Sequence, residues 1–201
     1  MKGRTRPSPC GSKKILRHPE NPPWGTARPG EVRLFFQDES RFGLHSVERR
    51  RIAARGVKLK VTQQMTFEYC YLFGAVEPAT GDDFLLELPA LNTETFQVFI
   101  DAFSQQYPST TNIMIMDRGA FHMARDLVIP GNVTFIFLPP YSPELNPIER
   151  YWKHLKDQIA WRAFEDLQQL KDHVARLICE TTPERVRSLT QFPFFMDAIN
   201  G

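Results

Sequence analysis

Residues 138–149, LPPYSPELNPIE, join an apolar run to a helical pattern through a proline-rich break. The run itself, NVTFIFL at residues 132–138, has the length and composition of a buried strand. Pro147 is placed to open a helix that continues to about Trp161, because proline is favoured at the first helical position. The stretch therefore predicts a strand, a stiff loop and a helix that carries Glu149 in its first turn.

Two other acidic residues follow apolar runs of strand length. Asp38 comes after RLFFQ, and Asp117 comes after NIMIM. Because side chains alternate along a strand, Ile113, Ile115 and Asp117 are expected to share one face of the sheet. Three carboxylates that converge from two strand ends and a helix start can hold two divalent cations, which is the equipment for cutting and joining phosphodiesters. The residues therefore favour a metal-dependent enzyme that processes DNA.

Three segments together resemble a known family. FQDESRFGL around Asp38, MDRGAFH around Asp117 and LPPYSPELNPIERYWKHLK around Glu149 are similar to the catalytic domain of DDE-superfamily transposases, in the mariner-like branch that includes bacterial insertion sequences. The resemblance implies an RNase H-like α/β fold, in the superfamily of the retroviral integrases. It also implies DNA transposition, that is, cleavage at element ends and strand transfer, with Asp38, Asp117 and Glu149 holding Mg²⁺ or Mn²⁺ in a two-metal site.

Each of these assignments has an alternative. Asp38 could be a solvated turn residue, and Glu39 is its rival because neighbouring strand residues face opposite sides of a sheet. The motif favours Asp38. Asn146, Pro147 and Glu149 could instead form a capping box at the helix start, which would explain the glutamate without catalysis.

Several cationic residues are candidates for DNA contacts. Arg118 stands where the family usually has asparagine, so it could bind the scissile phosphate or weaken metal affinity by repulsion. His122, predicted in a short helix, could orient a phosphate or water, but a packed, hydrogen-bonded histidine is the favoured interpretation. Trp152 is expected to pack beneath the helix, while Tyr151 could face DNA. The full predicted set, for which a solvated surface is the alternative, is Arg49, Arg50, Arg51, Lys58, Lys60, Arg118, His122 and Lys153.

Composition bounds the remaining possibilities. The chain has 201 residues, of which 42% are hydrophobic, enough to bury one sizeable core. A net charge of +2 is too small to indicate a nucleic-acid partner, so DNA affinity would come from local clusters. Cys10, Cys70 and Cys179 lack CxxC spacing, which fits a reducing cytoplasm. With no apolar run of membrane length, we expect a bacterial cytoplasmic protein, associated with the nucleoid when bound to DNA.

The pattern divides the chain into three parts. Residues 1–30 are basic, rich in proline and poor in apolar side chains, which predicts a mobile arm. Residues 31–162 form the predicted RNase H-like domain, a mixed sheet flanked by helices, in which Asn92 caps a helix carrying Phe96 and Phe99 on its apolar face. Residues 163–201 form a predicted helical extension packed on that domain.

The expected partners follow from the resemblance. The family normally places a helix-turn-helix region ahead of the catalytic domain, and residues 1–30 are too few to contain one. We therefore expect double-stranded DNA, a homodimer when active, and a separate helix-turn-helix polypeptide. The alternative is a truncated remnant that binds DNA without completing transposition. A nuclease of RNA–DNA hybrids shares the metal chemistry but is disfavoured by SPELNPIE.

Overall fold

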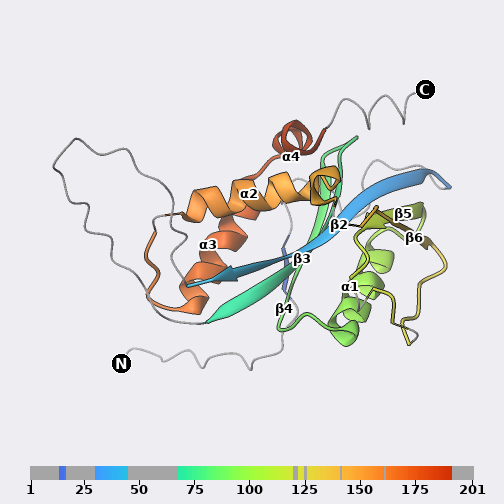
Figure 1. Ribbon diagram of the computed structural model, residues 1–201. Helices are drawn as coiled ribbons and strands as arrows, with labels where there is room; N and C mark the ends of the chain where they lie inside the picture. Colours follow the sequence, from blue (N-terminus) through green and yellow to red (C-terminus); the bar gives the residue numbers. More distant parts are fainter. Residues whose placement is uncertain are drawn as a thin grey trace, which may run out of the picture.

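One mixed sheet forms the centre of the molecule (Figure 1). The computed structural model describes residues 14–16, 30–44, 68–119, 122–124, 126–140, 142–160 and 162–191. The strand order is β1-β4-β3-β2-β5-β6, in which β2, β5 and β6 are parallel and the other pairings are antiparallel. The strands are β1 (Lys14–Leu16), β2 (Val32–Gly43), β3 (Tyr69–Glu77), β4 (Asp82–Leu88), β5 (Thr111–Met116) and β6 (Val133–Phe137).

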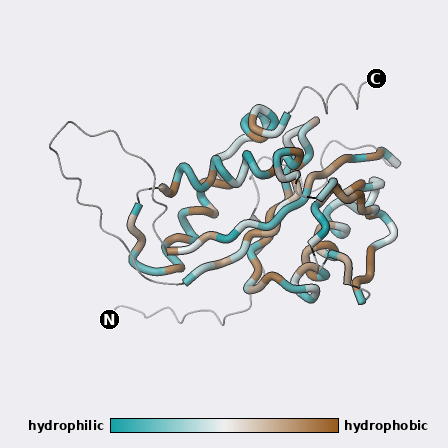
Figure 2. The backbone as a smooth tube through the Cα atoms, in the orientation of Figure 1, coloured by the Kyte–Doolittle hydropathy of each residue, from teal (hydrophilic) through white to brown (hydrophobic). Residues whose placement is uncertain are grey.

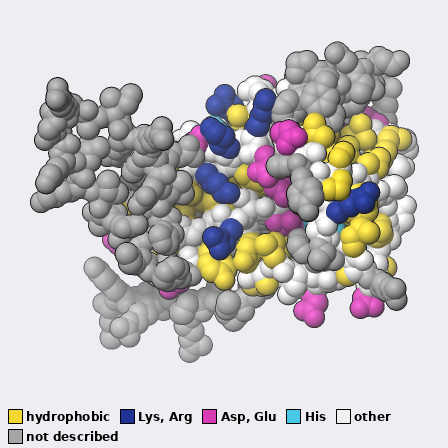
Figure 3. Space-filling view, in the orientation of Figure 1, with side chains coloured by type: hydrophobic (Ala, Val, Ile, Leu, Met, Phe, Trp, Pro, Cys, Tyr) yellow, Lys and Arg dark blue, Asp and Glu magenta, His cyan; other side chains and the backbone are white. Residues whose placement is uncertain are grey.

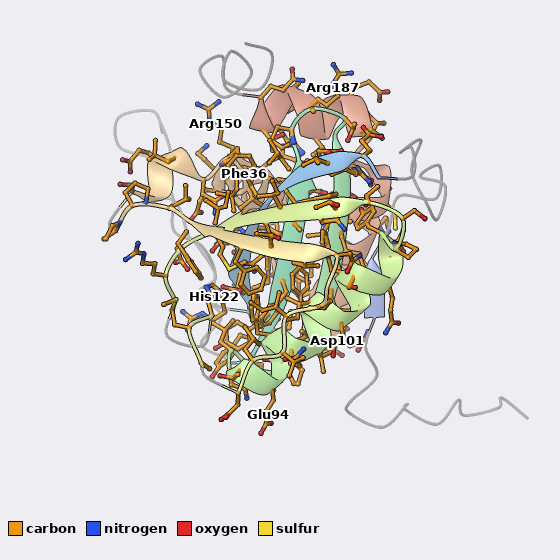
Figure 4. The ribbon with its side chains drawn as sticks, turned by 90° about the vertical axis from the view of Figure 1, so that its right-hand side faces the viewer. Phe36, Glu94, Asp101, His122, Arg150 and Arg187 are labelled. Carbon is orange, nitrogen blue, oxygen red and sulfur yellow. The ribbon has the colours of Figure 1, made fainter. Side chains whose placement is uncertain are left out.

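Helices cover both faces of the sheet, so each face has its own core (Figure 2). Side chains alternate along β2: Phe36 joins the core beneath α2, and Phe35 joins the core beneath α1. Figure 4 shows Phe36 on the α2 side and His122 on the α1 side. The helices are α1 (Thr93–Gln106) on one face and α2 (Ile148–Ile159), α3 (Leu167–Glu180) and α4 (Pro183–Thr190) on the other, with a short 3-10 helix, η1 (Pro143–Leu145), before α2.

Helix α1 forms as its sequence predicts. The side chain of Asn92 accepts the N–H of Thr95 at 2.8 Å, and the Thr95 hydroxyl accepts the N–H of Asn92 at 3.2 Å. This reciprocal capping box satisfies two backbone donors that the first turn leaves open. The helical spacing then buries one continuous stripe against the sheet, formed by Phe96, Phe99, Ile100 and Phe103, all with 0% exposure.

Strand β2 is longer than the apolar run VRLFFQ predicts. We expected it to end before Asp38, but β3 stays paired with it as far as Gly43 opposite Tyr69. The parallel neighbour β5 pairs only as far as Phe36 opposite Ile115. Asp38 therefore lies inside a strand, beside the point where its parallel neighbour has ended. The pairing with β3 keeps the backbone at Asp38 extended, as it would not be in a loop.

Strand β6 is less buried than predicted. It lies at the edge of the sheet, where it pairs with β5. Val133 is buried, but Ile136 is 47% exposed. An edge strand with one open side keeps alternating exposure even when its sequence is apolar throughout. Its role in the site comes from the loop that follows it.

Two further expectations differ from the structure. The described residues between Asp117 and Asn132 form turns rather than the short helix we predicted for His122. Lys14–Leu16, within the predicted mobile arm, pairs with β4 as an edge strand. The unpaired backbone groups of a sheet edge favour such an addition even from a segment poor in apolar side chains. The remainder of the arm, through residue 29, lies outside the described residues.

The C-terminal helices share the core beneath α2. Leu170, Val174 and Ile178 of α3 and Val186 of α4 are buried in that cluster. Lys171 forms an ion pair with Glu87 of β4 at 2.6 Å, which ties α3 to the sheet. None of the helices in the described part of the chain is long and apolar enough to cross a membrane.

Candidate active site

The three predicted acids line one open pocket of about 440 Å³. Asp38 comes from β2, Asp117 follows β5, and Glu149 lies in the first turn of α2. The pocket is at the carboxyl ends of the parallel strands β5 and β6, where open α/β sheets commonly bind ligands. The loop after β6 supplies another wall, and the remaining lining residues are Arg118, Gly119, Leu138, Pro139, Pro140, Ser142 and Asn146.

Asp38 is half-buried and held by helix α2. The indole Nε1 of Trp152 donates a hydrogen bond to Asp38 Oδ2 at 2.9 Å. Gly74, opposite Asp38 in β3, leaves room for the indole, because a Cβ there would lie 2.6 Å from Trp152 Cη2. Burial, followed by the charges of Glu149 and Glu39, raises the pKa of Asp38 to about 8. Sequence reasoning placed Trp152 beneath the helix correctly but missed this contact, for which a glycine inside an apolar strand was the available signal.

Asp117 is exposed but held by its own loop. Its Oδ1 lies 3.2 Å from Nδ1 of His122 and accepts the backbone N–H of Gly119 at 3.0 Å. The hydrogen bond with His122 is the largest cause that lowers the pKa of Asp117, and burial opposes it. Asp117 is therefore a stable anion in the same pocket that contains the protonation-prone Asp38.

Glu39, the rival of Asp38, points away from the pocket. Its Oε1 lies 3.0 Å from Nε2 of His122 and accepts the amide N–H of Gln37 at 2.6 Å. His122 packs on the ring of Phe96 in α1, at 4.5 Å between ring centroids. Burial would lower the pKa of His122, but the hydrogen bonds with Asp117 and Glu39 outweigh burial and raise it to about 9. The packed, hydrogen-bonded histidine that the sequence analysis favoured is the arrangement observed.

The start of α2 presents Glu149 to the pocket, and the capping box considered as its alternative role does not form. Pro147 occupies the cap position, and Glu149 is exposed in the first turn. Asn146 is buried and donates its amide N–H to the backbone oxygen of Gln37 at 2.9 Å. This bond fixes the loop against β2, because it joins the helix start to the residue preceding Asp38. Glu149 is thereby brought close enough for its charge to raise the pKa of Asp38.

Cationic side chains surround the acids. Figure 3 shows acidic side chains near the middle of the visible face, with Lys and Arg side chains on both sides. Arg118 lines the pocket. Burial lowers the pKa of Lys156, and the charges of Glu149 and Asp38 partly offset that effect. Lys153 is exposed and pairs with Asp157 at 3.1 Å.

Two sets of predicted DNA contacts have different outcomes. Tyr151 is fully buried and donates its hydroxyl hydrogen to Asp83 at 2.9 Å, so the expectation that it faces DNA is wrong. Its position in α2, directly before Trp152, turns it into the core beneath the helix. The predicted basic cluster, Arg49, Arg50, Arg51, Lys58 and Lys60, lies outside the described residues.

The pocket has the donor chemistry of a site for hard divalent cations. Its acidic donors are carboxylate oxygens, the ligand type that Mg²⁺ and Mn²⁺ prefer. Within the described ranges, no three acidic, histidine or cysteine side chains are arranged closely enough to hold one metal ion together. The charges of Glu149, Glu39 and Asp117 each raise the pKa of Asp38, after the larger effect of burial.

Comparison with known proteins identifies similar chains. An uncharacterised protein of Sinorhizobium fredii (strain NBRC 101917 / NGR234), y4pE/y4sA, is 35% identical over 107 residues, which are 52% of this chain and 79% of that protein. The Mos1 strand transfer complex matches with a TM-score of 0.62 at 15% identity, covering 79% of this chain and 50% of the Mos1 chain. The Mos1 mariner paired end complex with Mn has a TM-score of 0.63, at 15% identity, and the match covers 79% of this chain and 51% of that one.

The structural likeness confirms the RNase H-like fold class predicted from the sequence. This chain spans about half the length of the Mos1 chains it matches. Residues 33–171 match the sequence profile described as DDE superfamily endonuclease, a range that includes all three pocket acids. The chain therefore belongs to the DDE superfamily endonucleases.

Proposed function

We propose that this chain cuts DNA strands and transfers them to new sites, as the catalytic part of a transposase. The observation that carries the proposal is the convergence of Asp38, Asp117 and Glu149 on one pocket from three separate elements. Membership of an endonuclease family and likeness to a transposase strand transfer complex support the same chemistry. In this proposal the three acids bind metal, and none of them forms a covalent intermediate.

The pocket residues have different proposed roles. Asp38 is the central ligand, because β2 pairs with β5, which precedes Asp117, and is joined through Asn146 to the start of α2, which carries Glu149. Asp117 and Glu149 complete the two sides of a site for two Mg²⁺ or Mn²⁺ ions. Such ions would activate a water or a DNA 3′-hydroxyl and stabilise the leaving oxygen. Trp152 holds one oxygen of Asp38, and Pro139 and Pro140 form part of the pocket wall.

DNA would reach the pocket along its cationic rim. Arg118 lines the pocket and Lys153 is exposed on α2, so both are placed to contact phosphates. We propose that the protein binds double-stranded element ends and target DNA, and that it acts as a homodimer with a helix-turn-helix region supplied by a separate polypeptide. Because chromosomal DNA is the proposed substrate, the working location would be the bacterial cytoplasm at the nucleoid.

The test is Glu149→Gln, which keeps the length of the side chain and removes the charge that would hold metal. The full chain is incubated with pre-cut element-end DNA and Mn²⁺, and nicking and joining are measured on gels. We expect activity to fall by about 10³-fold, because several kcal/mol of transition-state stabilisation are lost. We expect the free energy of unfolding to change by less than about 1 kcal/mol, since no capping box involves this residue.

The same assay separates the alternatives. A well-folded Glu149→Gln protein that joins DNA at the parent rate would sink the metal-ligand role. A parent protein that binds DNA but neither nicks nor joins it would be the truncated remnant. Cleavage of an RNA–DNA hybrid in preference to duplex DNA would indicate the hybrid nuclease.

A further inference from the structure

Asp117 is an exposed residue with an ordered side chain. Its side chain is 67% exposed, and the residue directly follows Met116, the last residue of β5. An aspartate in such a position would ordinarily sample several rotamers in water. Here Oδ1 is engaged by His122 and by the N–H of Gly119. No hydrogen bond to Oδ2 occurs among the described residues, so one oxygen is anchored and the other remains available to a ligand.

His122 is held from several sides. Its side chain is 1% exposed, and its ring packs against Phe96. Nδ1 lies 3.1 Å from the backbone oxygen of Asp117, and the His122 N–H donates to the backbone oxygen of Gly119 at 3.0 Å. The turn and the ring therefore form one compact unit, which positions Nδ1 toward Asp117.

Glu39 completes the unit from another strand. Its side chain is 8% exposed, and Oε1 lies 3.0 Å from His122 Nε2. Gln37, two residues earlier on the same face of β2, donates to that same oxygen. The contact between Glu39 and His122 joins residues 83 positions apart, so it links the loop after β5 to the central strand.

We propose that Glu39 and His122 form a positioning clamp that anchors Oδ1 of Asp117 and leaves Oδ2 directed at the metal pocket. This inference rests on the proposed metal-ligand role of Asp117. Neither clamp residue lines the pocket, so both act through Asp117 rather than on the substrate. Partners that orient a ligand in this way typically contribute 10- to 100-fold to metal affinity.

The chain offers matched variants. His122→Phe keeps the ring stacking on Phe96 and removes both nitrogens, whereas His122→Asn keeps a donor near the position of Nδ1. Glu39→Leu removes the partner of Nε2, and Glu39→Gln restores a hydrogen-bonding group. His173→Phe is the control, because His173 also packs on a phenylalanine ring, Phe164 at 5.5 Å, but lies on α3 outside the pocket.

The measurement is Mn²⁺ affinity of each full-length, folded protein without DNA, followed by the free Mn²⁺ signal in electron paramagnetic resonance. We expect His122→Phe to weaken binding by about 10- to 100-fold and Glu39→Leu by about 10-fold. His122→Asn and Glu39→Gln should recover most of that loss, and His173→Phe should match the parent. A merely structural role would lower thermal stability without this order of affinities.

Cleavage assays add an independent readout. If the clamp orients a ligand, high Mn²⁺ should restore the cleavage rate of His122→Phe. The variant would need more Mn²⁺ than the parent but would reach the same limiting rate. A folded His122→Phe protein with parent affinity would overturn the clamp. If that variant does not fold, parent affinity in a folded Glu39→Leu protein would overturn it.

Asp117→Asn separates the two proposals. If this variant loses Mn²⁺ affinity while the His122 and Glu39 variants keep it, the clamp fails and the proposed function stands. If Asp117→Asn binds Mn²⁺ as the parent does, the metal-ligand role of Asp117 fails, and the clamp fails with it.

Discussion

Asp38 and Asp117 line the same pocket from neighbouring strands, yet their surroundings differ in nearly every respect. Asp38 is half-buried beneath an indole, and burial and nearby acids raise its pKa to about 8. Asp117 is exposed, and its hydrogen bond with His122 lowers its pKa. Identical side chains a few residues from the same sheet end thus differ in their preferred charge at neutral pH.

In the proposed metal site, the two acids would therefore respond differently to a bound cation. Asp117 is anionic whether or not a cation is present. The charges of Glu149, Glu39 and Asp117 disfavour ionised Asp38, so a bound divalent cation would offset this repulsion and favour the ionised form. The paired environments also show that the sheet alone does not set the chemistry, because the helix above one acid and the turn beside the other decide it.

The largest effect expected from this comparison is on activity. Asp38→Asn and Asp117→Asn should each lower Mn²⁺-dependent strand joining by about 10³-fold, because each removes a charged ligand. Gel assays with pre-cut DNA measure the rates. Parent activity in either folded variant would remove that acid from the proposed site.

The same variants should affect stability in opposite directions when metal is removed by a chelator. The raised folded-state pKa of Asp38 means that the parent loses stability as pH rises from about 4 through 8. Asp38→Asn lacks that loss and should equal or exceed the parent in stability at pH 8. The lowered pKa of Asp117 contributes stability above about pH 4, which Asp117→Asn should lose, by about 1 kcal/mol or less because the group is exposed. Urea unfolding at pH 5 and pH 8 measures both effects.

Gly74→Ala should perturb the Asp38 side selectively. The added methyl would meet the Trp152 ring at 2.6 Å, and overpacking of this kind costs about 1 to 3 kcal/mol. A displaced indole would also lose its bond to Asp38, so joining should slow. Gly131→Ala is the control, because nothing lies within 4 Å of a Cβ at Gly131. Equal thermal stability of the two variants would show that the close approach of Trp152 is unimportant.

Asp83 separates the effect of burial from that of crowded acids in the pocket. It is buried on β4, accepts the Tyr151 hydroxyl, and has a pKa raised to about 7, first by burial. Because its unfolded pKa is about 4, this group makes stability fall between about pH 4 and 7, by up to about 1.4 kcal/mol per pH unit. Asp83→Asn should flatten that part of the stability profile. An unchanged stability profile would mean that burial does not raise the pKa of Asp83 this far. Burial would then also be a weaker cause of the raised pKa of Asp38.

The smallest effect is expected at Lys153. Its exposed pair with Asp157 contributes about 0.5 kcal/mol or less, so Lys153→Ala should leave stability nearly unchanged. If Lys153 contacts a phosphate, the variant should bind DNA of every sequence more weakly. The slope of log affinity against log salt concentration should be smaller in magnitude by about one. An identical salt slope would place Lys153 outside the DNA path.

The sequence predicted an element correctly where the residues that determine it lie within a single segment. Helix α1 needed only the Asn92 cap and an apolar stripe, both readable in sequence. The family segments and the three acids were also recognisable along the chain, and all three acids line one pocket. The length of β2 was not predictable, because hydrogen bonds from β3 extend it past its apolar run.

The sequence by itself determined the α/β class, the family and the candidate acids, because these depend on periodicity, capping and short motifs. Only the tertiary structure decided that Asp38 faces α2 while Glu39 faces His122, that Tyr151 is buried, and that Trp152 bonds to Asp38. The physical reason is separation along the chain: Trp152 and Asp38 are 114 positions apart, and Glu39 and His122 are 83 apart. Contacts of this kind, together with the burial that shifts a pKa, exist only after the sheet and its helices have packed.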